Sequence, residues 1–262
     1  MAPSSRVLKL TVSYDGSRFI GWQRQAAGES IQGLLETALA RFEGGPVTVH
    51  GAGRTDAGVH ALGQVASAVV TCPHDTGVLC RGLNAQLPAD VRVLSVADAA
   101  PEFHARFNAR SKTYRYLLRN GPLASPFERQ TVWHVTDQLD HDAMVLAASM
   151  LTGSHDFAAF RSTGGSVSST VRTLTRSDFG VERNAALPGV DPEAAGRLLT
   201  YEVQGDGFLR HMVRAIVGTL VEVGRGGRTA ASVAALLDGG SRSEAGATAP
   251  SHGLYLVSVD YD

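Results

Sequence analysis

Residues 30–45 read SIQGLLETALARFEGG, and this stretch decides the fold of the first half of the chain. Its apolar residues recur at the spacing of one helical face; they are Ile31, Leu34, Leu35, Ala38, Leu39 and Phe42. Ser30 can cap this helix by accepting a hydrogen bond from its first turn, and the run Gly44-Gly45-Pro46 ends it. The sequence therefore predicts an amphipathic helix that packs one face against a sheet.

Strand patterns lie on both sides of this helix. Residues 8–14 alternate between apolar and polar, and Asp15-Gly16 follows as a turn. The other elements expected in this half are strands at 47–49, 64–70 and 91–96 and a short helix at 78–84. The resulting order is β-α-β-β-α-β, which is that of the ferredoxin-like motif.

The second half repeats this order of elements without a close repeat of residues. Its expected elements are strands at 114–118, 171–181, 198–203 and 254–261, and helices at 140–151, 209–223 and 229–237. Asp140 caps the first of these helices and Gly153 closes it. Small and polar stretches at 162–169, 182–196 and 241–250 predict loops or linkers. We therefore expect an α+β fold of two ferredoxin-like halves, residues 1–108 and 109–262, with sheets joined around a central cleft and helices on the outer faces.

The composition is that of an ordinary globular protein. The 262 residues include 24 basic and 25 acidic ones, and the hydrophobic fraction of 44% excludes wholesale disorder. The longest unbroken apolar run, Ala143 to Ala148, is far too short to cross a membrane, and the N-terminal residues hold no stretch of signal-peptide length. The two cysteines, Cys72 and Cys80, cannot form a disulfide framework or a cysteine-rich zinc site, so we expect a cytoplasmic protein.

The basic residues are strongly biased towards arginine. Only two of the 24 are lysines, Lys9 and Lys112, and arginine has a planar donor group that suits phosphates and stacks on bases. Basic residues cluster without intervening acids at 104–119 and 161–176, and a third acid-free stretch holds Arg18 and Arg24. Such patches can bind a polyanion although the whole chain is neutral, or they can be solvated surface. The candidate RNA-binding residues are Arg24, Arg106, Arg110, Lys112 and Arg161.

The segment GAGRTDAGVH, residues 51–60, lies between two expected strands. Its glycines allow the backbone to approach a ligand or another part of the chain closely. A single carboxylate, Asp56, follows Arg54 among small residues, which suggests a group held in a tight pocket. The alternative is a plain turn in which Asp56 bonds to its own backbone. No Gly-Lys-Ser/Thr follows, so the segment is not a phosphate-binding P-loop.

The string GRTDAGVHALGQVA, residues 53–66, resembles the signature of the tRNA pseudouridine synthase A family. Seven further blocks resemble this family in the same order, and together they cover essentially the whole chain. They are YDGSRFIGWQRQ (14–25), SIQGLLETAL (30–39), LNAQLPADVRV (83–93), FHARFNARSKTYRY (103–116), SHDFAAFR (154–161), FLRHMVRAIVGTLVEVG (208–224) and APSHGLYLVSVDY (249–261). The resemblance implies the pseudouridine synthase fold and the isomerisation of uridines in the tRNA anticodon stem-loop.

The resemblance also implies a role for each matched site residue. Asp56 corresponds to the catalytic aspartate, and Arg54 to the arginine that takes the place of the extruded base. Tyr114 corresponds to the tyrosine that stacks on the target base, Arg214 to the helix arginine that pairs with the aspartate, and Leu254 to an apolar residue of the pocket. The chain departs from the family in two places, because its 182–196 loop is long and Phe19 replaces a frequent tyrosine.

The chemistry implied by this resemblance needs an ionised carboxylate and no cofactor or metal. The carboxylate can add to the base, attack C1′ or remove a ribose proton, and the residues do not choose among these routes. Burial disfavours the anion and a nearby arginine favours it. We expect Arg214 to supply that charge from the helix at 209–223, with Arg210 one turn before it.

The residues leave two other functions open. One is a catalytically silent RNA-binding module that uses the same open sheet faces. The other is a nucleoside glycosidase, but such enzymes normally use two cooperating carboxylates, and only Asp56 lies in a motif of this kind. The partners that the resemblance implies are tRNA, contacted at the anticodon stem-loop and the body, and a second copy of the chain in a homodimer.

Overall fold

A computed structural model describes residues 5–162, 164, 168–182 and 196–261. The chain divides into two units. Unit 1 consists of Met1–Arg110 together with Tyr255–Asp262, and unit 2 consists of Ser111–Leu254. Most of the strand β10 (Leu254–Asp260) therefore belongs to the unit that the N-terminal residues build.

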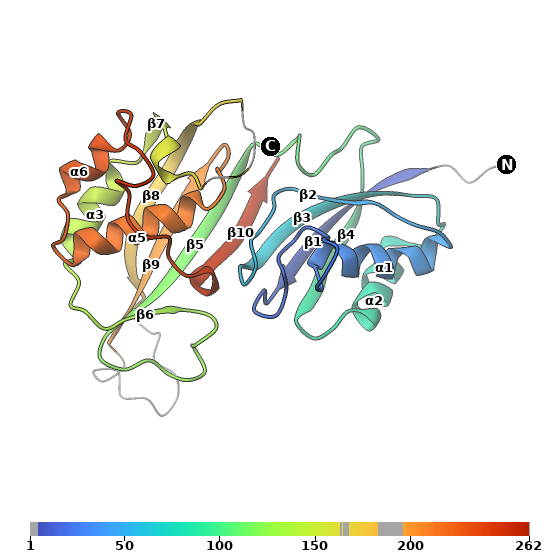
Figure 1. The fold of residues 1–262 in the computed structure, drawn as a ribbon. Helices are drawn as coiled ribbons and strands as arrows, with labels where there is room; N and C mark the ends of the chain where they lie inside the picture. Colours follow the sequence, from blue (N-terminus) through green and yellow to red (C-terminus); the bar gives the residue numbers. More distant parts are fainter. Residues whose placement is uncertain (1–4, 163, 165–167, 183–195, 262) are drawn as a thin grey trace. The chain divides into compact units, whose positions relative to one another are not determined.

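Unit 1 contains a sheet and two helices (Figure 1). Its elements are β1 (Arg6–Tyr14), α1 (Ile31–Glu43), β2 (Val49–Gly51), β3 (His60–Val70), α2 (Thr76–Gln86), β4 (Val91–Ala99) and the part of β10 (Leu254–Asp260) from Tyr255 onwards. The strand order is β4-β1-β3-β10, and β2 also pairs with β3. The strands β4, β1, β3 and β2 pair antiparallel, whereas β10 pairs with β3 in parallel.

The alternation of apolar and polar residues in β1 corresponds to a buried and a more exposed face of this sheet. Leu8, Leu10, Val12 and Tyr14 of β1 are buried, whereas Lys9, Thr11 and Ser13 between them are only partly covered. The predicted helix is confirmed as α1, since the Ser30 side chain accepts a hydrogen bond from Gly33 N and Gly44 ends the helix at a φ of 74°. This face of α1 buries Ile31, Leu35, Ala38 and Leu39.

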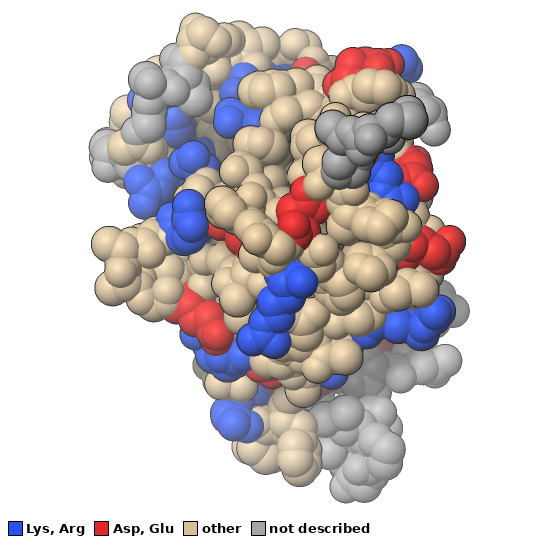
Figure 2. All heavy atoms as spheres, turned by 90° about the vertical axis from the view of Figure 1, so that its right-hand side faces the viewer, with Lys and Arg blue, Asp and Glu red and all other residues tan. Residues whose placement is uncertain are grey.

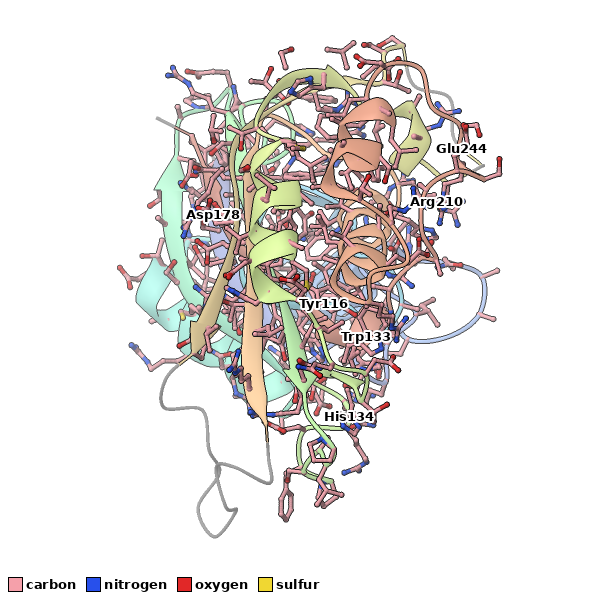
Figure 3. All side chains as sticks on the ribbon, turned by 90° about the vertical axis from the view of Figure 1, so that its left-hand side faces the viewer. Tyr116, Trp133, His134, Asp178, Arg210 and Glu244 are labelled. Atoms are coloured by element: carbon pink, nitrogen blue, oxygen red, sulfur yellow. The ribbon has the colours of Figure 1, made fainter. Side chains whose placement is uncertain are left out.

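Unit 2 also has one sheet with helices on one face (Figure 3). Its strands are β5 (Ser111–Asn120), β6 (Trp133–Val135), β7 (Gly153–Asp156), β8 (Val171–Glu182) and β9 (Arg197–Gly205). Its helices are α3 (His141–Ser149), α5 (Met212–Gly224) and α6 (Ala230–Ala235), with short 3₁₀ turns η1 (Ala158–Phe160) and η2 (Ser251–Gly253). The strand order is β5-β9-β8-β7, and β6 pairs with β5 in parallel.

Two expected helix boundaries in unit 2 are wrong. The helix capped by Asp140 ends at Ser149 with Met150 as its C-cap, and Gly153 instead opens β7 at a φ of 116°. The long helix begins at Met212 rather than Leu209, because His211 before it adopts the left-handed conformation at a φ of 61°. Leu209 is buried although it precedes the helix, which is why the apolar spacing continued back to it.

Candidate active site

The segment between β2 and β3 is held in place by buried hydrogen bonds. The Thr55 hydroxyl lies 2.8 Å from the Tyr14 hydroxyl in the interior, and the Thr55 carbonyl accepts a hydrogen bond from Trp22 N at 3.0 Å. Gln64 Nε2 donates to the Gly53 carbonyl at 2.9 Å. Burial raises the pKa of Tyr14 to about 12, so its hydroxyl is neutral and acts only as a hydrogen-bonding group. The backbone on the N-terminal side of Asp56 is thus fixed from two directions.

Two glycines let the 15–25 loop approach this segment closely. A Cβ on Gly16 would lie 2.0 Å from the Val59 carbonyl oxygen. A Cβ on Gly21 would lie 2.5 Å from the Thr55 carbonyl oxygen, and Gly21 has a φ of 108° that other residues rarely adopt. The motif GRTDAGVH is therefore packed against the GSRFIGWQ stretch, backbone to backbone.

Asp56 and Arg54 lie on either side of the buried Thr55. Arg54 is exposed and Asp56 is partly buried. A turn follows Asp56, since Val59 N donates to the Asp56 carbonyl at 3.1 Å and Gly58 has a φ of 77°. Within the described residues, the guanidinium of Arg54 forms no ion pair with an acid. A backbone turn thus follows Asp56, and its side chain extends from a segment that is hydrogen-bonded on both sides.

His60, at the end of this segment, is part of the packing. It is 2% exposed, and its ring stacks on Tyr255 with the centroids 4.7 Å apart. Its Nδ1 accepts a hydrogen bond from Gly16 N at 3.1 Å and lies equally close to a carboxylate oxygen of Asp15. Burial raises the pKa of Asp15, but hydrogen bonds from Ser17 and the nearby His60 outweigh it and lower that pKa overall. His60 thus anchors the 15–25 loop to the motif.

In unit 2, the sequence-predicted residues come from a strand, a helix and the start of β10, and all three are at least partly buried. Tyr114 of β5 is 8% exposed and meets Phe208 edge-on, with the ring centroids 4.9 Å apart. Tyr116, two residues along the same face, is fully buried and donates its hydroxyl to the Pro250 carbonyl at 2.7 Å. Burial strongly raises the pKa of Tyr116, and the neighbouring charge of Arg214 partly opposes this shift. Arg214 therefore lies near the Tyr116 hydroxyl (Figure 3 shows Tyr116 within the unit).

Arg214 is tied to the segment that precedes Leu254. Its Nε donates to the Ala249 carbonyl at 2.8 Å, and the Ala249 amide donates back to the Arg214 carbonyl at 3.0 Å. Leu254 follows directly after η2 and is 6% exposed. We expected Arg210 to lie one turn before Arg214 on the same helix. This expectation is wrong, because α5 starts only at Met212.

The segment 246–250, called the strap below, is not the linker that its small residues predicted. Gly246 N donates to Thr219 Oγ1 at 2.9 Å in the interior, and Ala247 N donates to Glu222 Oε1 at 3.2 Å. A Cβ on Gly218 would lie 1.7 Å from the Ala247 carbonyl oxygen, so only glycine fits there. The strap is thus bonded along α5 from Glu222 back to Arg214, and a glycine inside a long helix was its only local signal.

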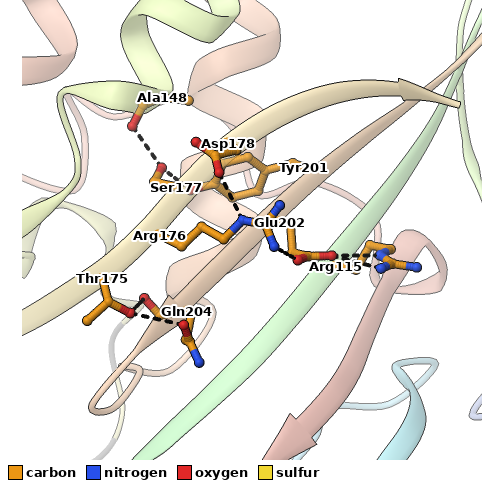
Figure 4. Close-up of polar contacts among 9 residues, drawn as sticks. All are labelled: Arg115, Ala148, Thr175, Arg176, Ser177, Asp178, Tyr201, Glu202 and Gln204. Atoms are coloured by element: carbon orange, nitrogen blue, oxygen red, sulfur yellow. Dashed lines mark hydrogen bonds and ion pairs between the residues drawn. The ribbon is translucent and has the colours of Figure 1, made fainter.

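Three arginines of the predicted basic clusters pair with acids from other parts of the chain. Figure 4 shows a row of charges across three strands of unit 2, on the face opposite the helices. Arg115 pairs with Glu202 at 2.8 Å, and Arg176 contacts both Glu202 and Asp178. Arg119 is buried and pairs with Glu128. The acid-free stretches of the sequence therefore do not make continuous basic surfaces, because their acidic partners come from other strands and loops.

The remaining RNA-binding candidates differ in their surroundings. Arg24 is exposed and lies 3.4 Å from Glu36, while its backbone N donates to Gln32. Arg106 and Arg110 are exposed in unit 1, and Lys112 and Arg161 are partly buried in unit 2. Across the described residues, Arg106, Arg110 and Arg161 form no ion pair with an acid. On the face shown in Figure 2, basic groups are separated by neutral and acidic residues.

The described residues contain no cluster of three or more His, Cys, Asp or Glu side chains that could hold a metal ion. Both cysteines are free. Within the same part of the chain, the helices are too short or too polar to cross a membrane. The expectation that no cofactor takes part stays a prediction.

A family model described as tRNA pseudouridine synthase matches residues 10–108 and 147–262. The matched ranges include Arg54, Asp56, Arg214 and Leu254, and they leave out Tyr114. The chain belongs to the tRNA pseudouridine synthase family. The resemblance seen in its eight sequence blocks is thereby confirmed, and the fold is the mixed α/β fold of this family.

Individual members of this pseudouridine synthase family are similar over nearly their full length. A protein named tRNA pseudouridine synthase A from Syntrophotalea carbinolica is 45% identical, covering 97% of this chain and 96% of that protein. The protein of the same name from Solidesulfovibrio magneticus is 47% identical, covering 97% of this chain and 90% of that protein. The one from Neisseria gonorrhoeae is 43% identical, covering 96% of this chain and 91% of that protein. Among solved structures, a Cbf5-Nop10-Gar1 complex covers 82% of this chain and 45% of that chain, at 14% identity and a TM-score of 0.33. That likeness is too distant to support an argument.

Proposed function

We propose that the protein isomerises uridine to pseudouridine in the anticodon stem-loop of tRNA. One observation carries the proposal: a family motif presents a single carboxylate, Asp56, on a backbone fixed by Thr55, Trp22 and the turn to Val59. An enzyme that acts on a base through a carboxylate must hold that group rigidly, because it has to meet a nucleotide that has left its stack.

In the proposed reaction the atoms balance within the RNA. The bond between C1′ and N1 of uridine breaks, the uracil turns, and C5 bonds to the same C1′ while the C5 proton is lost and N1 gains one. Asp56 acts as an anion, by adding to the base, attacking C1′ or taking a ribose proton. No electron leaves the system and no second substrate is consumed, so the residues themselves suffice.

The two units are proposed to supply complementary parts of one site. Unit 1 brings Asp56, and the exposed Arg54 fills the space left by the flipped base. Unit 2 brings Arg214 to pair with Asp56, Tyr114 to stack on the uracil and Leu254 to line the pocket. Support comes from the way the strap orients the Arg214 guanidinium through its Nε, and from the nearly buried Tyr114 ring beside Phe208.

The finer architecture belongs to the same proposal. We infer two ferredoxin-like halves, residues 1–108 and 109–262, whose sheets join around a central cleft, and a homodimer in which one tRNA contacts both copies. The pairing of β1 with β4 and β3, and of β2 with β3, within unit 1 supports the first part, since a ferredoxin-like sheet pairs its strands in this way. A cytoplasmic location, expected from the two cysteines, also stays a prediction.

The decisive experiment uses tRNA that carries tritium at C5 of uracil. The wild-type protein should release tritium into water, and Asp56→Asn should lower that rate by about 100-fold or more while keeping its affinity for tRNA. A matched control is Asp75→Asn, which changes an exposed acid of unit 1 that caps α2. Normal turnover in Asp56→Asn would contradict the assignment.

The same assay separates the two other functions. A nucleoside glycosidase would release free uracil, which chromatography detects. A silent RNA-binding module would bind tRNA and release neither tritium nor uracil.

A further inference from the structure

An exposed aromatic turn in unit 1 has no role in the reaction derived above. His104 and Asn108 close it reciprocally: Asn108 N donates to the His104 carbonyl at 3.1 Å, and His104 N donates to Asn108 Oδ1 at 2.6 Å. Inside the turn, His104 Nδ1 accepts from Arg106 N at 3.1 Å and from Phe107 N at 3.4 Å. The His104–Asn108 turn therefore holds a defined shape without help from a neighbouring strand.

The turn is also anchored to the sheet beneath it. Ala105 is fully buried with Ala52 and Val65. Its backbone N donates to Ser67 Oγ at 3.0 Å, and its carbonyl accepts from the Tyr261 hydroxyl at 2.7 Å. A segment held this firmly does not change shape to cover its own apolar side chain.

Phe107 nevertheless points into solvent. It is 75% exposed, although its ring contacts the His104 ring with the centroids 4.3 Å apart and tilted by 32°. The His50 ring also contacts the His104 ring, with the centroids 4.8 Å apart and the planes tilted by 34°. The Arg106 guanidinium lies 5.7 Å from the Phe107 centroid. Phe107 is thus a largely exposed ring that contacts one histidine ring and has a guanidinium over it.

We propose that the His104–Asn108 turn is a stacking platform for one unpaired nucleotide of the tRNA, and the proposal rests on the proposed function. Phe107 takes the base, and Arg106 and Arg110 contact the phosphates next to it. Aromatic side chains in this setting bind any base face, so the platform adds affinity without choosing a sequence.

Charge and size favour RNA over protein as the occupant. Arg106 and Arg110 are exposed and unpaired with acids among the described residues, and no acid lies within the turn; the nearest along the chain is Glu102. A protein interface normally needs an apolar area far larger than one ring. A single base needs only one exposed ring and a cation close by.

The test compares tRNA affinity and turnover in three variants. Phe107→Ala should raise the Kd for tRNA and the KM by about 5- to 150-fold, the range that base–aromatic stacking gives, with kcat at saturating tRNA nearly unchanged. Phe107→Trp should keep wild-type affinity, and its fluorescence should be quenched when tRNA binds. Phe127→Ala, which removes an 83% exposed phenylalanine in unit 2, should leave Kd unchanged.

The salt dependence of Kd sharpens the test. Stacking releases no counterions, so the slope of log Kd against log salt should stay the same in Phe107→Ala and fall in Arg106→Ala. An unchanged Kd in Phe107→Ala would overturn the proposal. So would a weakened self-association of Phe107→Ala in sedimentation velocity at wild-type tRNA affinity, since the occupant would then be a second copy of the chain.

The experiments can overturn the stacking platform and the proposed function independently of each other. If the wild-type protein bound tRNA without releasing tritium, the proposed reaction would be wrong, and the Kd comparison would still decide whether Phe107 stacks on RNA.

Discussion

Arg214 and Ala249 exchange two hydrogen bonds, one from the guanidinium Nε to the Ala249 carbonyl at 2.8 Å and one from the Ala249 amide to the Arg214 carbonyl at 3.0 Å. The first bond orients the side chain and the second fixes the backbone from which it extends. A helix arginine is thereby aimed by a segment 35 residues further along the chain. The position of the strap along α5 therefore affects any chemistry in which Arg214 takes part.

Replacing the Arg214 charge should remove turnover. We expect Arg214→Met to lower kcat by about 100-fold or more, because a carboxylate without its cation is a poorer anion in a closed site. The backbone bond from Ala249 N persists in this variant, so the Tm should change little. Arg225→Met is the control, since Arg225 pairs with Asp137 at an exposed position at the end of the same helix. Tritium release measures both, and a near-normal rate in Arg214→Met would remove the pairing from the mechanism.

Filling the contact between α5 and the strap should damage both stability and activity. A Cβ on Gly218 would lie 1.7 Å from the Ala247 carbonyl, so Gly218→Ala must displace the strap at a cost of about 1–3 kcal/mol. Because the strap orients Arg214, kcat should fall as well. Gly45→Ala, where a Cβ meets nothing within 4 Å, should change neither quantity. Thermal unfolding and single-turnover rates check this, and a stable, fully active Gly218→Ala would contradict the role of the strap.

The backbone contact behind Asp56 can be tested in the same way. Gly21→Ala combines a φ of 108° with a Cβ 2.5 Å from the Thr55 carbonyl, so it should cost about 1–3 kcal/mol and shift the Asp56 loop. Gly28→Ala also forces a residue into a positive φ of 88°, but its Cβ meets only the Ile20 side chain. Both variants should lose stability, and only Gly21→Ala should lose kcat under conditions where both are folded. Equal kcat values would show that the contact does not position Asp56.

The turn under Phe107 should open in acid. Burial lowers the pKa of His104, and the neighbouring His50 and Arg106 lower it further. A histidine whose pKa is lowered on folding contributes stability that is complete above its unfolded pKa of about 6.5 and is lost as the pH falls through the folded pKa. Protonation of Nδ1 also removes the acceptor for two backbone amides.

The measurement is an NMR titration of the His104 ring together with tRNA binding across the same pH range. The His104 pKa should lie below 6.5, and the ratio of the Kd of Phe107→Ala to that of the wild-type protein should fall towards one as the pH drops below it. A His104 pKa above that of an unfolded histidine would contradict the geometry of the turn.

Features that depend on neighbours in sequence were predicted well. The helix α1 was placed to within a residue, because its apolar face, the Ser30 cap and the Gly44 terminus are all local signals. The start of α5 was wrong, because nothing in the residue pattern shows that His211 takes a left-handed conformation while Leu209 stays buried.

Features that depend on distant residues were missed. The small residues of the strap predicted a linker, and its partners Thr219 and Glu222 lie on a helix more than twenty residues earlier. The acid-free stretch around Arg115 predicted a basic surface, but Glu202 on a neighbouring strand neutralises it. Periodicity and composition report how a segment is built, and they carry no information about which other segment it meets.

The return of β10 to unit 1 has a consequence for how the protein is made. Val259 and Tyr261 pack on the cluster of Ala52, Val65 and Ala105, and β10 pairs along β3, the strand that follows the Asp56 segment. A nascent polypeptide that has left the ribosome only as far as residue 254 lacks both the packing of Val259 and Tyr261 and the pairing of β10 with β3. The unit that bears Asp56 can therefore complete its sheet and its core only after all of unit 2 has been translated.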